Sequence, residues 1–342
     1  MSGASSSSRT VLPPLPDLNA DLERRLAQTP PGQVTTFGAL AKSLGDRRAA
    51  VWVANLVAAL PENGLLPWHR VVRADGTLPA IGPRLERQRS RLAAEGVASV
   101  DVAPGRAIVD PRAPRRRDFE GASVLQPLLD WQREMAARID ESPRTGPIEL
   151  VAGLDVAFAA DGRACGAAVV VNVRERTVIG SAAASLPDPF PYIPGYLTFR
   201  ELPVLLELWQ RLAAAGLPAD IAMVDGQGRL HPRRAGIASA FAAVSAVPTI
   251  GVGKSLLCGR PLATNDPDLA EIVDDGERIG WSLSPGGRFK PIYISVGGGL
   301  SLDQALACVR SQLTGRRLPL PTHEADRLSK QAVGGPVGTS AS

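Results

Sequence analysis

Hydrophobic positions in the first third of the chain recur at the three- and four-residue spacing of amphipathic helices. Residues 17–28, which begin with an Asp at the capping position, predict one helix, and residues 37–45 and 49–60 predict two shorter ones. Two short helices joined by the turn GDRR can form a helix-turn-helix, whose second helix enters a groove of DNA. An ordinary helical hairpin would show the same pattern. We therefore expect a mainly α, winged-helix-like domain here.

A second pattern begins near Asp118. A helical segment is followed by runs of apolar and β-branched residues that predict strands, with two further helical segments between the later strands. The predicted strands are residues 148–159, 166–173, 176–185, 221–226 and 248–253, and the predicted helices are 124–139, 202–216 and 237–246. Three consecutive strands followed by alternating helices and strands indicate an α/β domain with a mixed central sheet.

The length of 342 residues suggests two domains rather than one. The Ser- and Pro-rich residues 1–16 and the last residues, 331–342, are expected to be disordered tails. Residues 105–117 are rich in Pro and Arg and are interpreted as a linker. These boundaries predict domains at residues 17–104 and 118–330.

Composition narrows the class of protein. The net charge of +4 and the pI near 9.2 are a modest indication of a polyanionic partner such as nucleic acid. Three widely spaced cysteines, with no CxxC pair, indicate neither a disulfide framework nor a zinc site. No apolar run reaches membrane-spanning length, and the N-terminus lacks the apolar core of a secretory signal. A cytoplasmic protein without a membrane partner is expected.

Three carboxylates are candidates for a metal site. Asp155 and Asp225 lie at the ends of two predicted strands, and Glu201 closes the segment PYIPGYLTFRE. The carboxyl edge of the sheet is the usual position of a site in α/β folds, and crowded carboxylates need a cation. A hard cation such as Mg²⁺ would activate water for phosphodiester hydrolysis. Taken singly, each acidic residue could equally be a cap or turn residue.

Two further motifs accompany these carboxylates. Pro residues on both sides hold Tyr192 at the tip of a stiff turn, where an aromatic ring could pry apart a substrate or simply pack. Lys254 follows another predicted strand and could reach a phosphate. The segment DGQGRLHPRRAG at residues 225–236 adds glycines that let the backbone approach a planar ligand.

Residues from about 118 to 330 resemble endonuclease V, a family of deoxyinosine-specific repair nucleases. The matching segments are GLDVAF, PYIPGYLTFRE, VDGQGRLHPRRAGIAS, PTIGVGKSLL, KPIYISVG and RRLPLPT. The resemblance implies an RNase H-like fold and Mg²⁺-dependent cleavage, with Mn²⁺ able to substitute, on the 3′ side of the lesion. It makes Asp155, Glu201 and Asp225 metal ligands and catalytic residues, and Lys254 a catalytic residue at the scissile phosphate.

The same resemblance implies a base-binding site. Tyr192 would fill the gap left by a flipped base. The implied hypoxanthine pocket is lined by Gly195, Leu197, Gly226, Gly228, His231, Ile237 and Leu257. This chain departs from the family at Gly298, where a histidine is usual, so an altered rate or metal dependence is expected. Tyr196 and Phe158 replace a common leucine and a common tyrosine.

The segment LPWHRVV at residues 66–72 resembles the PCHRV active site of O6-alkylguanine-DNA alkyltransferases, with Trp68 in place of the nucleophilic cysteine. Tryptophan cannot accept an alkyl group as a thiolate does. The resemblance implies an alkyltransferase-like domain that binds and flips alkylated guanine without repairing it. Its DNA- and base-binding residues would be Phe37, Trp68, His69 and Arg70, while Val51 stands where the family has an intercalating arginine. A buried Trp beside a structural His is the alternative.

Together these features predict a two-domain DNA repair protein in which a non-catalytic reader of O6-alkylguanine is fused to a Mg²⁺-dependent endonuclease and directs it to alkylated DNA. The expected partners are DNA containing deoxyinosine or O6-alkylguanine, and nucleotide-excision-repair proteins. An inosine-specific ribonuclease is one alternative. A non-catalytic scaffold that binds DNA damage is another.

Overall fold

The computed structural model describes residues 10–286 and 289–334, which form two compact units. The smaller unit comprises residues 14–130 and 191–194. The larger unit comprises residues 131–190 and 195–334 together with residues 10–13. The prediction of two domains is confirmed, although residues 118–130 group with the smaller unit and not with the larger one as predicted.

The smaller unit is mainly helical, and the predicted short helices are present. Its elements are α1 (Leu18–Ala27), β1 (Thr35–Thr36), α2 (Phe37–Ser43), η1 (Arg47–Ala49), α3 (Ala50–Ala59), η2 (Trp68–Arg70), β2 (Val71–Val72), α4 (Pro83–Ala94), β3 (Ser99–Ala103) and β4 (Arg106–Val109). Asp17 caps α1 by accepting from the backbone N–H of Ala20 at 3.0 Å, and Thr36 caps α2 in the same way through Ala39 at 3.1 Å.

The interpretation of residues 105–117 as a linker is wrong. Strand β4 pairs antiparallel with β3, and Ala107 and Val109 are buried in the core of the smaller unit. The following residues run beside Val34, whose N–H donates to the carbonyl of Pro114 at 2.9 Å. The high Pro and Arg content hid the two-residue alternation of Ala107 and Val109, which is the signal of a half-buried strand.

The larger unit is built on a mixed sheet of nine strands within the described residues. The strands are β5 (Leu150–Phe158), β6 (Arg163–Asn172), β7 (Thr177–Pro187), β8 (Ile221–Asp225), β9 (Thr249–Gly253), β10 (Arg260–Ala263), β11 (Leu269–Asp274), β12 (Glu277–Leu283) and β13 (Ile292–Gly298). Their order is β10-β11-β12-β13-β9-β8-β5-β6-β7. Strand β8 runs parallel to both β5 and β9, and the other pairs are antiparallel. The predicted mixed sheet is confirmed.

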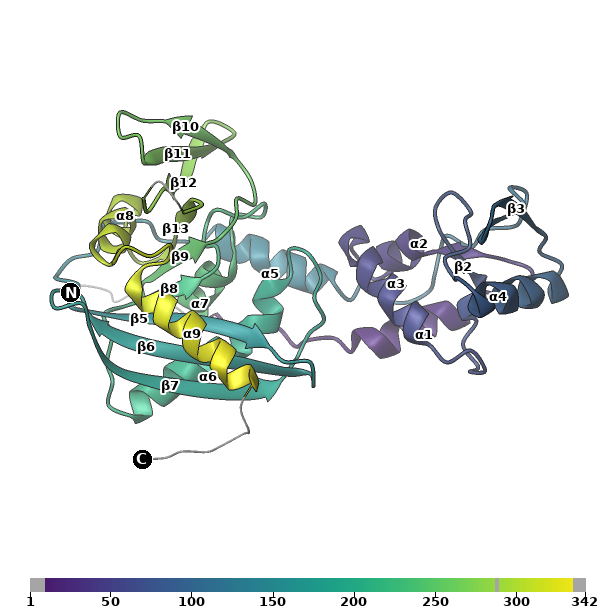
Figure 1. The fold of residues 1–342 in the computed structure, drawn as a ribbon, viewed down its shortest axis with the longest axis horizontal. Helices are drawn as coiled ribbons and strands as arrows, with labels where there is room; N and C mark the ends of the chain where they lie inside the picture. The colour runs from purple at the N-terminus through teal and green to yellow at the C-terminus, as the bar shows by residue number, and fades with distance from the viewer. Residues whose placement is uncertain (1–9, 287–288, 335–342) are drawn as a thin grey trace, which may run out of the picture. The chain divides into compact units, whose positions relative to one another are not determined.

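Helices cover both faces of this sheet. They are α6 (Leu197–Ala214), α7 (Ile237–Ser245), α8 (Leu302–Ser311) and α9 (Leu320–Gly334). Helix α5 (Gln126–Ala136) begins in the residues of the smaller unit and ends in those of the larger unit. Helix α9, yellow in Figure 1, crosses strands β5, β6 and β7 on one face, and α6 lies on the other. The alternation along β6 explains this arrangement, because Val169 packs with Ala325 of α9 while Gly166 faces Val204 of α6. None of the helices in the described part of the chain is long and apolar enough to cross a membrane.

Two element boundaries differ from the prediction. Helix α6 begins at Leu197, five residues before the predicted start, so Glu201 lies within the helix. Helix α9 continues to Gly334, so residues 331–334 are helical and not part of a disordered tail. Residues 1–9 and 335–342 of the predicted tails lie outside the described residues.

Gly153 allows α9 to begin directly against β5. A Cβ atom at this position would overlap the backbone carbonyl of Pro321, and backbone cannot move aside as a flexible side chain can. Gly153 lies two residues before Asp155 on the same strand. The absence of a side chain at residue 153 therefore sets the position of α9 next to this carboxylate.

We expect Gly153→Ala to destabilise the larger unit by about 1–3 kcal/mol, because the new methyl group has to displace α9 from β5. Urea unfolding followed by circular dichroism measures this change. Gly38→Ala is the matched control, since Gly38 lies in α2 with open space around it and alanine favours a helix. Equal stability of Gly153→Ala and the unchanged protein would contradict the close approach.

Candidate active site

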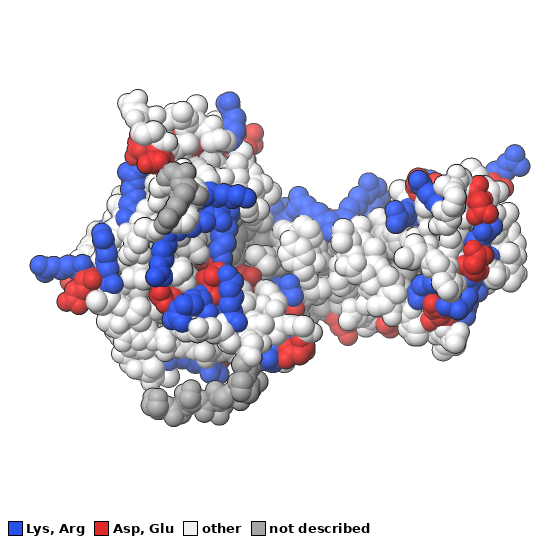
Figure 2. All heavy atoms as spheres, viewed as in Figure 1, with Lys and Arg blue, Asp and Glu red and all other residues white. Residues whose placement is uncertain are grey.

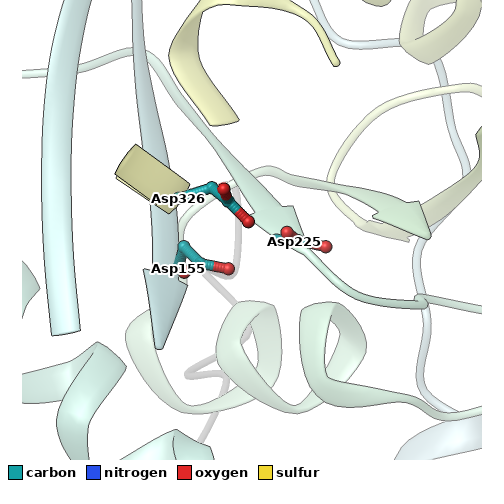
Figure 3. A group of neighbouring side chains, drawn as sticks. All are labelled: Asp155, Asp225 and Asp326. Carbon is teal, nitrogen blue, oxygen red and sulfur yellow. The ribbon is translucent and has the colours of Figure 1, made fainter. Parts of the chain in front are cut away.

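Three carboxylates from separate elements meet at one place in the larger unit. Asp155 lies on β5 and Asp225 ends the neighbouring parallel strand β8, in a register that sets Leu154 beside Val224. Asp326 comes from α9, which crosses these strands. One carboxylate oxygen of each residue lies within 4.8 Å of the others. Figure 3 shows the three side chains pointing toward one another. The predicted convergence of Asp155 and Asp225 is thus present.

Sequence reasoning missed Asp326. This residue follows the RRLPLPT segment on a helix whose charged residues look like a solvated face. Its spacing to Lys330, four residues later, was the local signal available. Only the packing of α9 on the sheet brings Asp326 to Asp155, and no local pattern reports that contact.

Glu201 lies on α6 and is buried, but it is not part of the three-carboxylate group. Burial raises the pKa of Glu201 well above its usual value, and the negative charges of Asp155 and Asp225 raise it further. Glu201 is therefore close enough to interact electrostatically with both aspartates. Its role as a metal ligand stays a prediction.

Two lysines approach the carboxylates. The Nζ atom of Lys254 forms ion pairs with Asp225 and, at 2.6 Å, with Oδ1 of Asp326. The Nζ atom of Lys330 lies 2.6 Å from Oδ2 of Asp326. Burial alone would lower the pKa of Lys254, but the charge of Asp225 and the hydrogen bonds to both aspartates raise it more, so this lysine is cationic. Figure 2 shows Lys and Arg side chains bordering a small acidic group on this unit.

The donor set fits a hard divalent cation. Oδ2 of Asp225 is buried and accepts no well-aligned hydrogen bond, although Lys254 lies against it as an ion pair. Burial, together with the charge of Asp225, raises the pKa of Asp155 to about 8. Crowded carboxylates are the ligands that Mg²⁺ and similar ions prefer. Asp155, Asp225 and Asp326 are therefore the residues that could hold a metal.

Several predicted base-binding residues lie directly after β8. Gly226 contacts the Ile237 side chain at the start of α7, and Gly228 lies so close to the carbonyl of Val296 that a Cβ would overlap it. His231 is buried, and its Nδ1 accepts from the backbone N–H of Arg233 at 3.2 Å. Gly226, Gly228, His231 and Ile237 thus belong to one tightly packed segment, whereas the predicted pocket residue Leu257 is half exposed.

The PYIPGYLTFRE segment contains two tyrosines, Tyr192 and Tyr196, of which the first is exposed and the second is buried. The Tyr192 side chain is 62% exposed. Tyr196 is buried and packs against Phe190 and Phe199, with ring centroids 6.2 and 6.1 Å apart. Gly195 accepts a hydrogen bond from the Arg233 guanidinium through its carbonyl, and Leu197 begins α6. Tyr196, which replaces the leucine common in the family, therefore packs in the aromatic core with Phe190 and Phe199.

Gly298 lies away from the carboxylates. It pairs with Thr249 at the beginning of β9, whereas Lys254 follows Gly253 at the other end of that strand. The four residue steps between these ends span roughly 13 Å. The expected effect of Gly298 on the rate or on metal dependence stays a prediction.

In the smaller unit, the residues of the LPWHRVV segment surround Glu95, which sequence reasoning did not single out. His69 Nε2 lies 2.8 Å from Glu95 Oε1, and Arg70 donates to the same carboxylate at 2.7 Å. Burial by itself raises the pKa of Glu95, but the hydrogen bonds from Arg70 and His69 outweigh it and lower the pKa to about 2. Glu95 thus holds both His69 and Arg70 in a partly buried hydrogen-bond network.

Trp68 is buried and fixed on two sides. Its Nε1 donates to the carbonyl of Glu62 at 3.2 Å, and the Arg84 guanidinium lies 4.0 Å from the ring centroid. Phe37 begins α2, and Val51 is 67% exposed at the start of α3. A structural Trp agrees with this geometry, and so does a Trp that forms the wall of a base site.

We expect the affinity of the full-length protein for Mn²⁺ to rise roughly tenfold per pH unit between pH 6 and 8, and to level off above pH 8. The reason is that Asp155, with a pKa of about 8, is protonated below that pH, and a metal has to displace the proton. Electron paramagnetic resonance of free Mn²⁺ measures the affinity. An affinity that stays constant from pH 6 to 8.5 would contradict the raised pKa of Asp155.

Comparisons with known proteins agree with this geometry. Residues 133–327 match the family model for endonuclease V, and residues 18–97 match the model for the DNA-binding domain of 6-O-methylguanine DNA methyltransferase. The larger match contains all three aspartates of the cluster and Lys254.

Solved structures of endonuclease V are similar over the same region. The Streptomyces avermitilis protein is 31% identical, with 61% of this chain and 92% of that chain covered and a TM-score of 0.56. The human protein is 29% identical, with 61% and 98% covered and a TM-score of 0.55. The Bacillus subtilis protein is 29% identical, with 63% and 92% covered and a TM-score of 0.56. Because the endonuclease V model matches more than half of its residues, the chain belongs to the endonuclease V family.

Proposed function

We propose that this endonuclease uses Mg²⁺ to nick DNA on the 3′ side of deoxyinosine. The observation that carries the proposal is the meeting of Asp155, Asp225 and Asp326 beside Lys254 in an endonuclease V fold. A cluster of buried and partly buried carboxylates is costly for a protein that only binds DNA, since like charges repel where hydration is incomplete. This cost favours a nuclease over the non-catalytic scaffold.

The three aspartates would hold the metal, which when bound activates water and stabilises charge on the phosphate. Lys254 pairs with Asp225 and Asp326, so its ammonium group lies at the edge of the same centre. There it can bind an oxygen of the scissile phosphate. Glu201 lies buried next to Asp155 and Asp225, and we propose that it completes the acidic environment as a further ligand.

A relative from Ciona intestinalis supports a deaminated base as the substrate. That endonuclease V, 25% identical with 61% of this chain and 98% of that chain covered and a TM-score of 0.54, was solved with DNA containing an inosine followed by a ribo-adenosine. We propose that Tyr192, exposed between two prolines, fills the space of the flipped inosine. The ribo-adenosine in the relative's substrate keeps an inosine-specific ribonuclease as the second candidate.

For the smaller unit we propose binding of O6-alkylguanine without alkyl transfer. The support is the match of residues 18–97 to an alkyltransferase DNA-binding domain, together with Trp68 at the position of the nucleophile. An indole ring has no thiolate to accept the alkyl group. Phe37, His69 and Arg70 would contribute to this DNA site, with His69 and Arg70 oriented by Glu95. Nucleotide-excision-repair partners and a cytoplasmic location stay predictions.

Asp326→Asn should lower Mg²⁺-dependent nicking of a deoxyinosine duplex by more than about 100-fold, because it removes a metal ligand. Gel analysis of an end-labelled duplex, with Mg²⁺ or EDTA, measures the rate. Asp303→Asn is the matched control, since the Asp303 carboxylate is 71% exposed and pairs with the surface residue Arg278. Nicking by Asp326→Asn at the unchanged rate would exclude the three-aspartate centre. Faster cleavage of inosine-containing RNA than of DNA would favour the ribonuclease.

We expect the two units to cooperate on DNA that carries both lesions. A duplex with both O6-methylguanine and deoxyinosine should be nicked faster than a duplex with deoxyinosine alone, at protein concentrations below saturation. Trp68→Ala should abolish this preference, because it removes the wall of the guanine site, while leaving nicking of the deoxyinosine duplex unchanged. Equal rates on the two duplexes with the unchanged protein would contradict delivery by the smaller unit.

A further inference from the structure

One turn of helix α9 directs three polar side chains to the carboxylate cluster. Asp326, Ser329 and Lys330 have the i, i+3, i+4 spacing that places residues on one face of a helix. Asp326 supplies a carboxylate and Lys330 pairs with it. Ser329 is fully buried, and its hydroxyl donates a hydrogen bond to Oδ2 of Asp155. Ser329 thus contacts Asp155 of β5, whereas Lys330 contacts Asp326 of its own helix.

We propose that Ser329 is a positioning residue of the metal centre, which holds Oδ2 of Asp155 so that the remaining oxygen faces the metal. The proposal rests on the proposed function, since it concerns the same centre. The terminal torsion of an aspartate is broad, so a carboxylate without a partner can rotate. A buried hydroxyl that holds one oxygen removes that freedom. Partners of this kind tune the affinity of metal sites by orienting the ligands.

The position of Ser329 couples the two sides of the cluster. Asp155 belongs to β5, whereas Asp326 and Ser329 belong to the same turn of α9. The beginning of α9 is set against β5 at Gly153, where no side chain fits. Hence the docking of α9 brings in a ligand and, through Ser329, orients a second ligand on the strand. Lys254 and Lys330 hold the two oxygens of Asp326 from the other side.

A purely structural hydrogen bond between helix and strand would have a different consequence. Its loss would lower the free energy of unfolding, but it would leave the metal affinity of the folded protein unchanged. The metal affinity therefore distinguishes positioning from packing.

The test compares full-length Ser329→Ala with the unchanged protein. Ser239→Ala is the matched control, because Ser239 is also a buried helical serine, on α7, and its hydroxyl has no hydrogen-bond partner within the described residues. We expect Ser329→Ala to bind Mn²⁺ about 10–100-fold more weakly, as measured by electron paramagnetic resonance without DNA. Ser239→Ala should bind as the unchanged protein does. The Mg²⁺ concentration for half-maximal nicking of a deoxyinosine duplex should rise by the same factor, with the rate at saturating Mg²⁺ largely restored.

A second variant separates the hydrogen bond from the cavity that alanine leaves. Ser329→Cys keeps nearly the same volume but is a weak donor, so it should also bind Mn²⁺ more weakly than the unchanged protein. Unchanged Mn²⁺ affinity in Ser329→Ala or in a folded Ser329→Cys would overturn the inference. Asp225→Asn serves as the reference: if it loses Mn²⁺ binding while the Ser329 variants keep it, the inference fails and the metal centre stands. If Asp225→Asn also binds as the unchanged protein does, the proposed function fails with it.

Discussion

Repulsion among crowded carboxylates, two of them buried and two partly buried, is the constraint on which the larger unit depends. Asp155, Asp225 and Asp326 lie within 4.8 Å of one another, and Glu201 is buried beside them. Charges this close are unfavourable without compensation, and burial makes each one costlier. Two lysines provide part of the compensation, and protonation of Asp155, whose pKa is about 8, provides more. A divalent cation would provide the positive charge that the lysines and the proton on Asp155 supply without it. The cluster of carboxylates therefore suits metal-assisted hydrolysis.

The fold supplies the close packing that such a site needs. The register of the parallel strands β5 and β8 sets Asp155, inside β5, at the level of Asp225, at the end of β8. Helix α9 approaches β5 without an intervening side chain at Gly153. Close approach also governs the segment after β8, where Gly228 lies against the backbone of β13. Loops and helices placed this tightly hold ligands within the narrow geometric limits that catalysis requires.

In the smaller unit a carboxylate is stabilised in its ionised form by hydrogen-bond donors and, among the described residues, is not crowded by other carboxylates. There a single partly buried carboxylate, Glu95, accepts hydrogen bonds from His69 and Arg70 and stays ionised to low pH. Hydrogen bonds to an ionised group in a poorly hydrated place are strong, so this network orders the chain around Trp68. Trp68 is in turn covered by Arg84. The site is rigid, although it lacks the nucleophile of the alkyltransferases it resembles.

The sequence by itself determined the elements with strong local signals. Capped helices α1 and α2 and the apolar strands β5, β6, β8 and β9 follow from periodicity. Asp225 and Lys254 lie at strand ends as predicted, whereas Asp155 lies inside β5, three residues before its end. Strand β10, whose residues are all exposed, and the short β4 within a Pro- and Arg-rich stretch gave no such signal.

Tertiary structure alone decided the remaining parts of both sites. Asp326 and Ser329 lie about 170 residues from Asp155 along the chain, and Glu95 lies 26 residues from His69. Local patterns record only which face of an element is apolar. They do not record which other element covers that face, so the charged turn of α9 reads as solvated until its contact with β5 is known. That contact brings a third aspartate to the carboxylate cluster and a serine hydroxyl to Asp155.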